Sequence, residues 1–170
     1  DTSVKLATEI IDTFEKIYED KWLNMMRAKL GLFGADEKDK SLILDLLKWM
    51  HIKKADYTNI FCHLMNKDKL KNRIFKDSDF LNWKKKWKIR LFNNNKSLND
   101  CVKLMNSVNP LVIPRNHKVD EAIEAAEQNN FEPTFKLLEI LKKPYSFQKN
   151  TSIYQMPTIL DKKYQTFCGT

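Results

Sequence analysis

Residues 1–109 contain no proline, and the whole 170-residue chain has only three glycines. So few glycines exclude a glycine-rich loop that cradles phosphate groups. The chain has no run of about 18 apolar residues, which excludes a membrane-spanning helix. Its start lacks the basic and then apolar pattern of a secretory signal peptide. We therefore expect a soluble protein without a membrane partner.

The cysteines and histidines do not form a recognisable site. The three cysteines are Cys62, Cys101 and Cys168, an odd number without Cys-x-x-Cys spacing. A zinc site or a disulfide framework is therefore not expected, and the compartment is predicted to be reducing. We expect the cytoplasm, or a mitochondrion if the source is eukaryotic. The three histidines are scattered and predict no metal site.

The net charge is +8, which suits an acidic partner such as nucleic acid, a nucleotide or an anionic surface. Residues 83–90 interleave aromatic and basic side chains, as some nucleic-acid surfaces do. However, Trp83 and Trp87 are four residues apart and share one helical face with Phe80. This spacing predicts a core helix whose lysines face water, so nucleic acid is not the expected partner.

Apolar residues at helical spacing predict seven helices. The expected ranges are 3–30, 38–52, a helix starting at 56–58, a helix capped within 77–79, 97–107, 118–129 and 132–142. Gly31 is expected just after the end of the first helix, and Asp39 or Ser41 is expected to cap the second. The predicted inward side chains include Leu98 in the fifth helix and Ile123 in the sixth. No strand-like alternation of useful length occurs, so the predicted class is all-α, an irregular bundle of six or seven helices.

The first predicted helix is the most strongly periodic segment, with Leu6, Ile10, Phe14 and Ile17 in one stripe. At 1.5 Å per residue it would be about 40 Å long, too long for a small bundle to cover. We expect it either to bend or to pack on something outside this chain. The chain starts at Asp1 without an initiator methionine, so we also expect it to be cut from a longer protein or processed.

Prolines become frequent only after residue 109, and the stretch 109–117 is the most distinctive in the chain. Its polar and proline residues are Asn109, Pro110, Pro114, Arg115, Asn116 and His117. The residues before each proline should be extended, and Asn116 or His117 should cap the next helix. One interpretation is a packed connector whose polar groups satisfy local carbonyls. The other is that Arg115 and His117 contact a ligand or phosphate.

Residues 1–143 are predicted to form the helical domain, and residues 144–170 an extended tail that carries aromatic side chains. Cys168 lies near the end of this tail. It is either an incidental free thiol or a redox-active group that reaches a partner thiol. The chain has neither a His-Glu-x-x-His motif nor a Gly-x-Ser-x-Gly elbow, so no complete active site is expected in it.

Several of these pieces together resemble the selenoprotein O family, also called YdiU or UPF0061. The pieces, in chain order, are Met26-x-x-Lys29-Leu30-Gly31-Leu32, Asp56-Tyr57-Thr58 with Phe61, Trp83 to Trp87 with Arg90-Leu91, Asn109-Pro110, Ile113 to His117 with Val119 and Glu121-Ala122-Ile123, Pro144-Tyr145, and Phe167 to Thr170. The resemblance covers nearly the whole chain and matches the C-terminal region of the family.

The resemblance implies a function that the residues alone do not. Members of the family are kinase-like proteins that transfer AMP from ATP to protein hydroxyl groups, with magnesium. Their nucleotide and metal ligands lie upstream of the matched region, so no catalytic, cofactor-binding or metal-binding residue is expected here. The expected partners are the upstream kinase-like core and the protein substrates of the whole enzyme. Cys168 occupies the position of the family's redox-regulatory cysteine or selenocysteine.

The sequence therefore predicts the helical C-terminal portion of a selenoprotein O-like protein adenylyltransferase. On this prediction the fragment is an inactive scaffold with a redox-sensitive tail. The alternative is a free-standing basic helical module that binds nucleic acid or an acidic protein.

Overall fold

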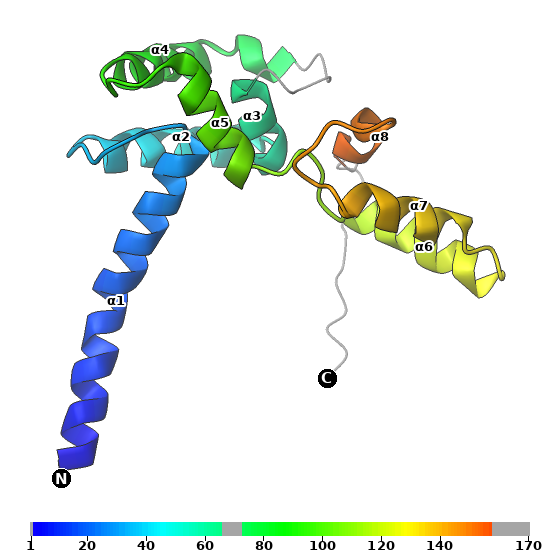
Figure 1. Ribbon diagram of the computed structural model, residues 1–170, viewed down its shortest axis with the longest axis horizontal. Helices are drawn as coiled ribbons and strands as arrows, with labels where there is room; N and C mark the ends of the chain where they lie inside the picture. The colour runs from blue at the N-terminus through cyan, green and yellow to red at the C-terminus, as the bar shows by residue number, and fades with distance from the viewer. Residues whose placement is uncertain (1, 66–72, 158–170) are drawn as a thin grey trace. The chain divides into compact units, whose positions relative to one another are not determined.

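The computed structural model describes residues 2–65 and 73–157, and every regular element in these ranges is a helix (Figure 1). The elements are α1 (Thr2–Lys29), α2 (Asp39–Lys53), α3 (Tyr57–Leu64), the 3-10 helix η1 (Arg73–Lys76), α4 (Ser78–Phe92), α5 (Leu98–Val108), α6 (Asn116–Glu127), α7 (Glu132–Leu141) and α8 (Thr151–Gln155). The predicted all-α class is confirmed.

Contacts within the chain divide it into two compact units, Asp1–Asn109 and Pro110–Thr170. The division falls inside the proline-containing connector. Residues after 143 were predicted to be extended, but 151–155 form α8, in which Thr151 and Gln155 are buried. The Thr151 hydroxyl accepts a hydrogen bond from the Gln148 amide at 2.8 Å, which gives this short helix a polar anchor at its start.

Three tryptophans on α2 and α4 form the centre of the first unit. Trp83 and Trp87 are buried and stack with ring centroids 6.0 Å apart, and Trp49 stacks on Phe80 at 4.6 Å. Each indole N–H has an acceptor: the Leu42 carbonyl for Trp83, the Leu30 carbonyl for Trp87 and the Asp77 carboxylate for Trp49. Burying an indole costs little free energy once its N–H is hydrogen-bonded. The burial of Trp83 and Trp87 confirms the prediction of a core helix.

In the first unit, the predicted start of α3 within 56–58 and the predicted cap of α4 within 77–79 are confirmed, since Asp56 and Asp77 directly precede these helices. The side chains of Asp56, Asp77 and Ser97 accept hydrogen bonds from the first amides of α3, α4 and α5. The prediction of Asp39 or Ser41 as the cap of α2 is wrong, because Lys38 precedes the helix and provides no side-chain cap. Asp39 is instead buried in an ion-pair cluster described below.

Gly31 ends α1, as predicted, with φ +71°, in the left-handed region that favours glycine. A Cβ at this position would lie 2.9 Å from the Cys101 carbonyl oxygen and 3.0 Å from Met105 Cγ. Glycine therefore allows both the end of α1 and the close approach of α5.

The first two-thirds of α1 have no covering element in the unit to which the helix belongs. The exposed apolar side chains are Val4, Leu6, Ile10, Ile11, Phe14, Ile17 and Tyr18, which are 55–70% exposed. By contrast, Met26 and Lys29 in the last turns are buried. The straight, projecting helix in Figure 1 thus carries an apolar stripe that the described residues of its unit do not cover.

The second unit is built on the antiparallel pair α6 and α7. Its core contains Val112, Ala122, Leu137 and Ile140. The amides of Leu111 and Val112 both donate to the Pro144 carbonyl, at 2.7 and 3.4 Å. Two predicted core residues are in fact exposed, Leu98 in the first unit (69%) and Ile123 here (53%). Leu98 is the first residue of α5, and Ile123 lies about 100° around α6 from the buried Ala122.

Candidate functional site

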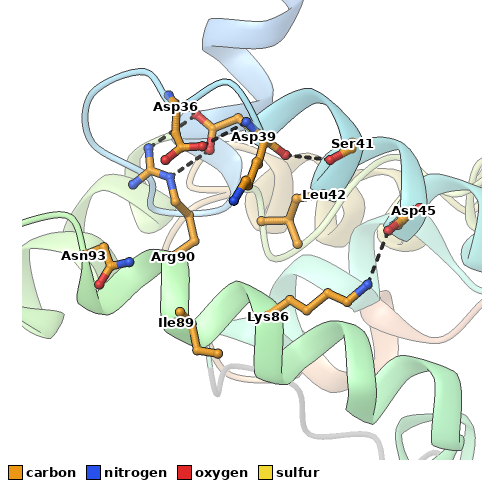
Figure 2. A pocket seen from close by; sticks show the side chains of 10 residues that line it. Asp36, Asp39, Ser41, Leu42, Asp45, Lys86, Ile89, Arg90 and Asn93 are labelled. Carbon is orange, nitrogen blue, oxygen red and sulfur yellow. Dashed lines mark hydrogen bonds and ion pairs between the residues drawn. The ribbon is translucent and has the colours of Figure 1, made fainter.

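The carboxylate of Asp39, whose side chain is fully buried, is the centre of a cluster of ion pairs and hydrogen bonds. Arg27 Nε donates to Oδ2 at 2.6 Å, and Arg90 Nε donates to Oδ1 at 2.8 Å. The Asp36 amide adds a third bond, to Oδ2, at 3.0 Å. Figure 2 shows Arg90 reaching from α4 toward Asp39 and Asp36. One carboxylate therefore joins the end of α1, the start of α2 and the end of α4.

Arg90 also fixes the loop that follows α1. Its NH2 group donates to the carbonyls of Phe33 and Gly34, each at 3.2 Å, and its NH1 group donates to Asn94. Burial alone would raise the pKa of Asp39, but the hydrogen bonds from Arg90, Arg27 and the Asp36 amide outweigh it and lower this pKa. Asp39 is therefore held ionised, with both oxygens occupied, and is unsuited to act as a general base.

A pocket of about 420 Å³ lies beside this cluster, between α2 and α4 (Figure 2). Its lining residues are Asp36, Lys38, Asp39, Ser41, Leu42, Asp45, Lys86, Ile89, Arg90 and Asn93. Lys86 and Asp45 face each other across it at 3.9 Å, and the Ser41 hydroxyl donates to the Lys38 carbonyl. Charges of both signs line this pocket, and its serine is not paired with a histidine, so it carries no arrangement for nucleophilic catalysis.

Lys29, part of the matched motif around Gly31, is a second buried charge. Only 8% of the residue is exposed, and its ammonium lies 4.3 Å from the centre of the Phe61 ring and 5.3 Å from that of Tyr57. Burial lowers the pKa of Lys29, and the nearby Cys62 partly opposes this shift. The two rings supply a cation–π environment that substitutes in part for water.

Asn109 is placed at the end of α5 and is 1% exposed. Its Nδ2 donates to the Lys29 carbonyl at 2.9 Å, which ties the end of α5 to the end of α1. Its Oδ1 has no hydrogen-bond donor in the described part of the chain. The side-chain amide of Asn109 thus donates to a carbonyl that has no hydrogen-bond partner within α1, because it lies in the last turn of the helix.

The other connector residues lie in the second unit. Arg115 is buried, and its Nε donates to the Tyr154 carbonyl at 3.3 Å, which links the start of α6 to α8. Asn116 or His117 was predicted as the cap, but they are the first two helical residues, and Arg115 holds the cap position without a capping hydrogen bond from its side chain. Pro110 and Pro114 flank the buried Leu111 and Val112. These contacts are those of a packed connector, and ligand contact by Arg115 and His117 stays a prediction.

The predicted redox residue, Cys168, lies outside the described residues. Cys62 and Cys101 are buried, at 0% and 1% exposure.

Between residues 2 and 157, leaving out 66–72, no group of three or more His, Cys, Asp and Glu side chains is arranged to hold a metal ion. None of the helices in these ranges is both long and apolar enough to cross a membrane.

Sequence reasoning missed the cluster around Asp39 and the environment of Lys29. Arg27 and Arg90 lie 12 and 51 residues from Asp39, and no local pattern signals such pairing. The only available signal was an aspartate next to a helix start, which is equally typical of a cap.

Comparison with known proteins gives consistent matches. A family model described as protein adenylyltransferase SelO matches residues 3–142. Three similar relatives are each called protein nucleotidyltransferase YdiU. The one from Pelagibacter ubique is 50% identical over 100% of this chain, and those from Alcanivorax borkumensis and Clostridium perfringens are each 41% identical over 100% of it. The chain spans 35–36% of the length of these relatives.

Proposed function

Because this chain belongs to the SelO family of protein adenylyltransferases, we propose that it is the helical C-terminal portion of an enzyme that transfers AMP from ATP to protein hydroxyl groups. The observation that carries the proposal is 50% identity over the whole chain to a protein nucleotidyltransferase, of which the chain spans 35%. The remaining length in that relative is ample for a kinase-like core that holds the nucleotide.

The apolar stripe of α1 supports a scaffolding role in such an enzyme. Ile10, Phe14 and Ile17 are each more than half exposed, although buried apolar side chains of this size each stabilise a fold by about 1.5–3 kcal/mol. We assign this stripe as the surface on which the kinase-like core packs. The core would bury it and hold the first unit in place.

ATP and magnesium belong, on this proposal, to the core rather than to this chain. The pocket beside Asp39 does not fit them, because the Asp39 carboxylate is occupied by two arginines and the amide of Asp36. The chain's three glycines also provide no phosphate-binding loop. No step of AMP transfer is therefore assigned to a residue of this chain.

Radiolabelled ATP tests the proposal. The chain is incubated with labelled ATP, magnesium and a mixture of protein substrates, alone and joined to the remaining region of the whole protein. We expect protein labelling only from the joined protein. Labelling by the chain alone would refute the scaffold assignment, and no labelling by the joined protein would refute the activity.

We further propose that Cys168 forms a reversible disulfide with a thiol in the kinase-like core. An oxidant such as hydrogen peroxide would take two electrons and two protons from the two thiols as the sulfur–sulfur bond forms. The support is the resemblance of the terminal Phe167 to Thr170 segment to the family. Non-reducing peptide mapping of the whole protein after mild oxidation should find Cys168 in a disulfide-linked peptide. An unpaired Cys168 under these conditions would contradict the proposal.

A further inference from the structure

Lys29 is the only buried lysine in the part of the chain that the structure describes, with 8% of the residue exposed. Within residues 2–65 and 73–157, its ammonium has neither a hydrogen-bond acceptor nor a carboxylate partner. It lies instead 4.3 Å from the centre of the Phe61 ring and 5.3 Å from that of Tyr57. The buried ammonium thus has aromatic neighbours but no oxygen atom that could balance its charge.

Other cations that leave water in this chain are bonded to oxygen atoms. Arg27 and Arg90, whose side chains are 13% and 12% exposed, both pair with the Asp39 carboxylate. The buried Arg115 donates to a backbone carbonyl of α8. Burying a charge without such a partner is costly, and two aromatic rings compensate for the lost water only in part. Lys29 therefore lacks the acceptor that these arginines have.

Lys29 lies on the side of α1 that carries the apolar stripe. The 18 residues from Ile11 to Lys29 make about five helical turns, so these two residues lie in the same direction around the helix axis, and Tyr18 lies within about 20° of them. Ile11 and Tyr18 are 70% and 61% exposed. Where the exposed part of α1 ends, the Tyr57 hydroxyl donates to Met26 Sδ at 3.6 Å, and Tyr57 is itself 43% exposed. A partner that packs along the stripe therefore reaches α3 at Tyr57, beside the Lys29 ammonium.

We propose that an aspartate or glutamate of the kinase-like core pairs with the Lys29 ammonium where the core packs on α1. This inference rests on the proposed function, and most of the length of the Pelagibacter relative lies outside the matched chain and is available to supply the carboxylate. Burial lowers the pKa of Lys29 more than the nearby Cys62 raises it, and a carboxylate would raise this pKa and hold the amine charged. The pair would also fix the register of the core along the stripe, since one buried charge accepts one partner position.

The thermal unfolding midpoint of Lys29→Met tests the inference, measured both in this chain alone and in the whole protein. Methionine keeps the length and packing of the side chain but removes its charge. In the chain alone the midpoint should stay the same or rise, because an uncompensated buried charge is removed. In the whole protein it should fall by several degrees, because the carboxylate of the core loses its partner. The matched control Lys16→Met removes one positive charge from an exposed position on another side of α1 and should change neither midpoint.

The variant Ile10→Asp/Phe14→Asp in the whole protein separates this inference from the proposed function. If it lowers the midpoint of the whole protein and Lys29→Met does not, the core covers the stripe without a carboxylate at Lys29, and the inference alone is overturned. If neither variant lowers that midpoint, the scaffold assignment fails and the inference fails with it. A lower midpoint of Lys29→Met in the chain alone would mean that a carboxylate of this chain already pairs with Lys29, which would also overturn the inference.

Discussion

His63 is a titratable side chain held in a half-buried, aromatic environment. Its ring stacks on Phe75 with centroids 3.6 Å apart, and Lys84 Nζ lies 3.3 Å from its Nε2. Burial, and secondly the charge of Lys84, lower the pKa of His63 from 6.5 to about 4. Folding therefore requires this imidazole to stay neutral at pH values where the unfolded chain would protonate it.

The consequence is a loss of stability on the acid side. Between pH 6.5 and about 4 the unfolded state binds a proton that the folded state does not, so the free energy of unfolding falls as the pH falls through this range. We expect His63→Gln, which does not titrate, to flatten this dependence. Urea denaturation at pH 7, 6, 5 and 4.5 measures it. An equally steep decline in the variant would show that other groups cause the acid sensitivity.

At the scale of single residues, the sequence predicted side chains whose role is local and failed for those whose partners are distant. Asp77 caps α4, within the predicted 77–79, because a cap needs only the next three residues. Asp39 is also an aspartate at a helix start, but it is buried and forms an ion pair with Arg90 of α4. Only the tertiary arrangement decides between a cap and a buried ion pair.

At the scale of helices, the end of α1 depends on the absence of a side chain at Gly31. A Cβ there would meet the backbone oxygen of Cys101, which cannot move without α5, and φ is +71°. We expect Gly31→Ala to destabilise the protein by about 1–3 kcal/mol through overpacking and backbone strain.

Gly34 offers a matched control for this change. Its φ is +68°, yet a Cβ there would meet no atom within 4 Å. Gly34→Ala thus carries the backbone strain without the clash, and the difference in thermal unfolding midpoint between the two variants isolates the contact with α5. Equal midpoints would mean that the close approach of α5 to Gly31 contributes nothing.

Helix positions were predictable to within one or two residues, because apolar spacing repeats along each helix. The sequence predicted less well which apolar residues of a helix are buried. Leu98 and Ile123 belong to the apolar pattern but lie where their units provide no neighbour. The short helix α8 was missed because five residues are too few to show a helical period.

At the scale of the whole molecule, the sequence predicted the class and the family, whereas the division at Asn109 and Pro110 emerged only from the packing. The predicted excess length of α1 corresponds to an apolar stripe that is exposed in its unit. The connector residue Arg115 forms a local bond to the Tyr154 carbonyl, and the polar cluster around Asp39 was not predicted. The expected compartment and the alternative of a free-standing module stay predictions.

The central claim is that α1 packs on a kinase-like core, and binding between this chain and the separately produced remaining region of the whole protein tests it most directly. The variant Ile10→Asp/Phe14→Asp places charges in the stripe, while Asp12→Ala/Lys16→Ala alters the opposite side of α1 without changing the net charge. By titration calorimetry we predict that the unaltered chain and the second variant bind equally, and that the first binds at least about tenfold more weakly. Equal binding by all three, or no binding by the unaltered chain, would contradict the account.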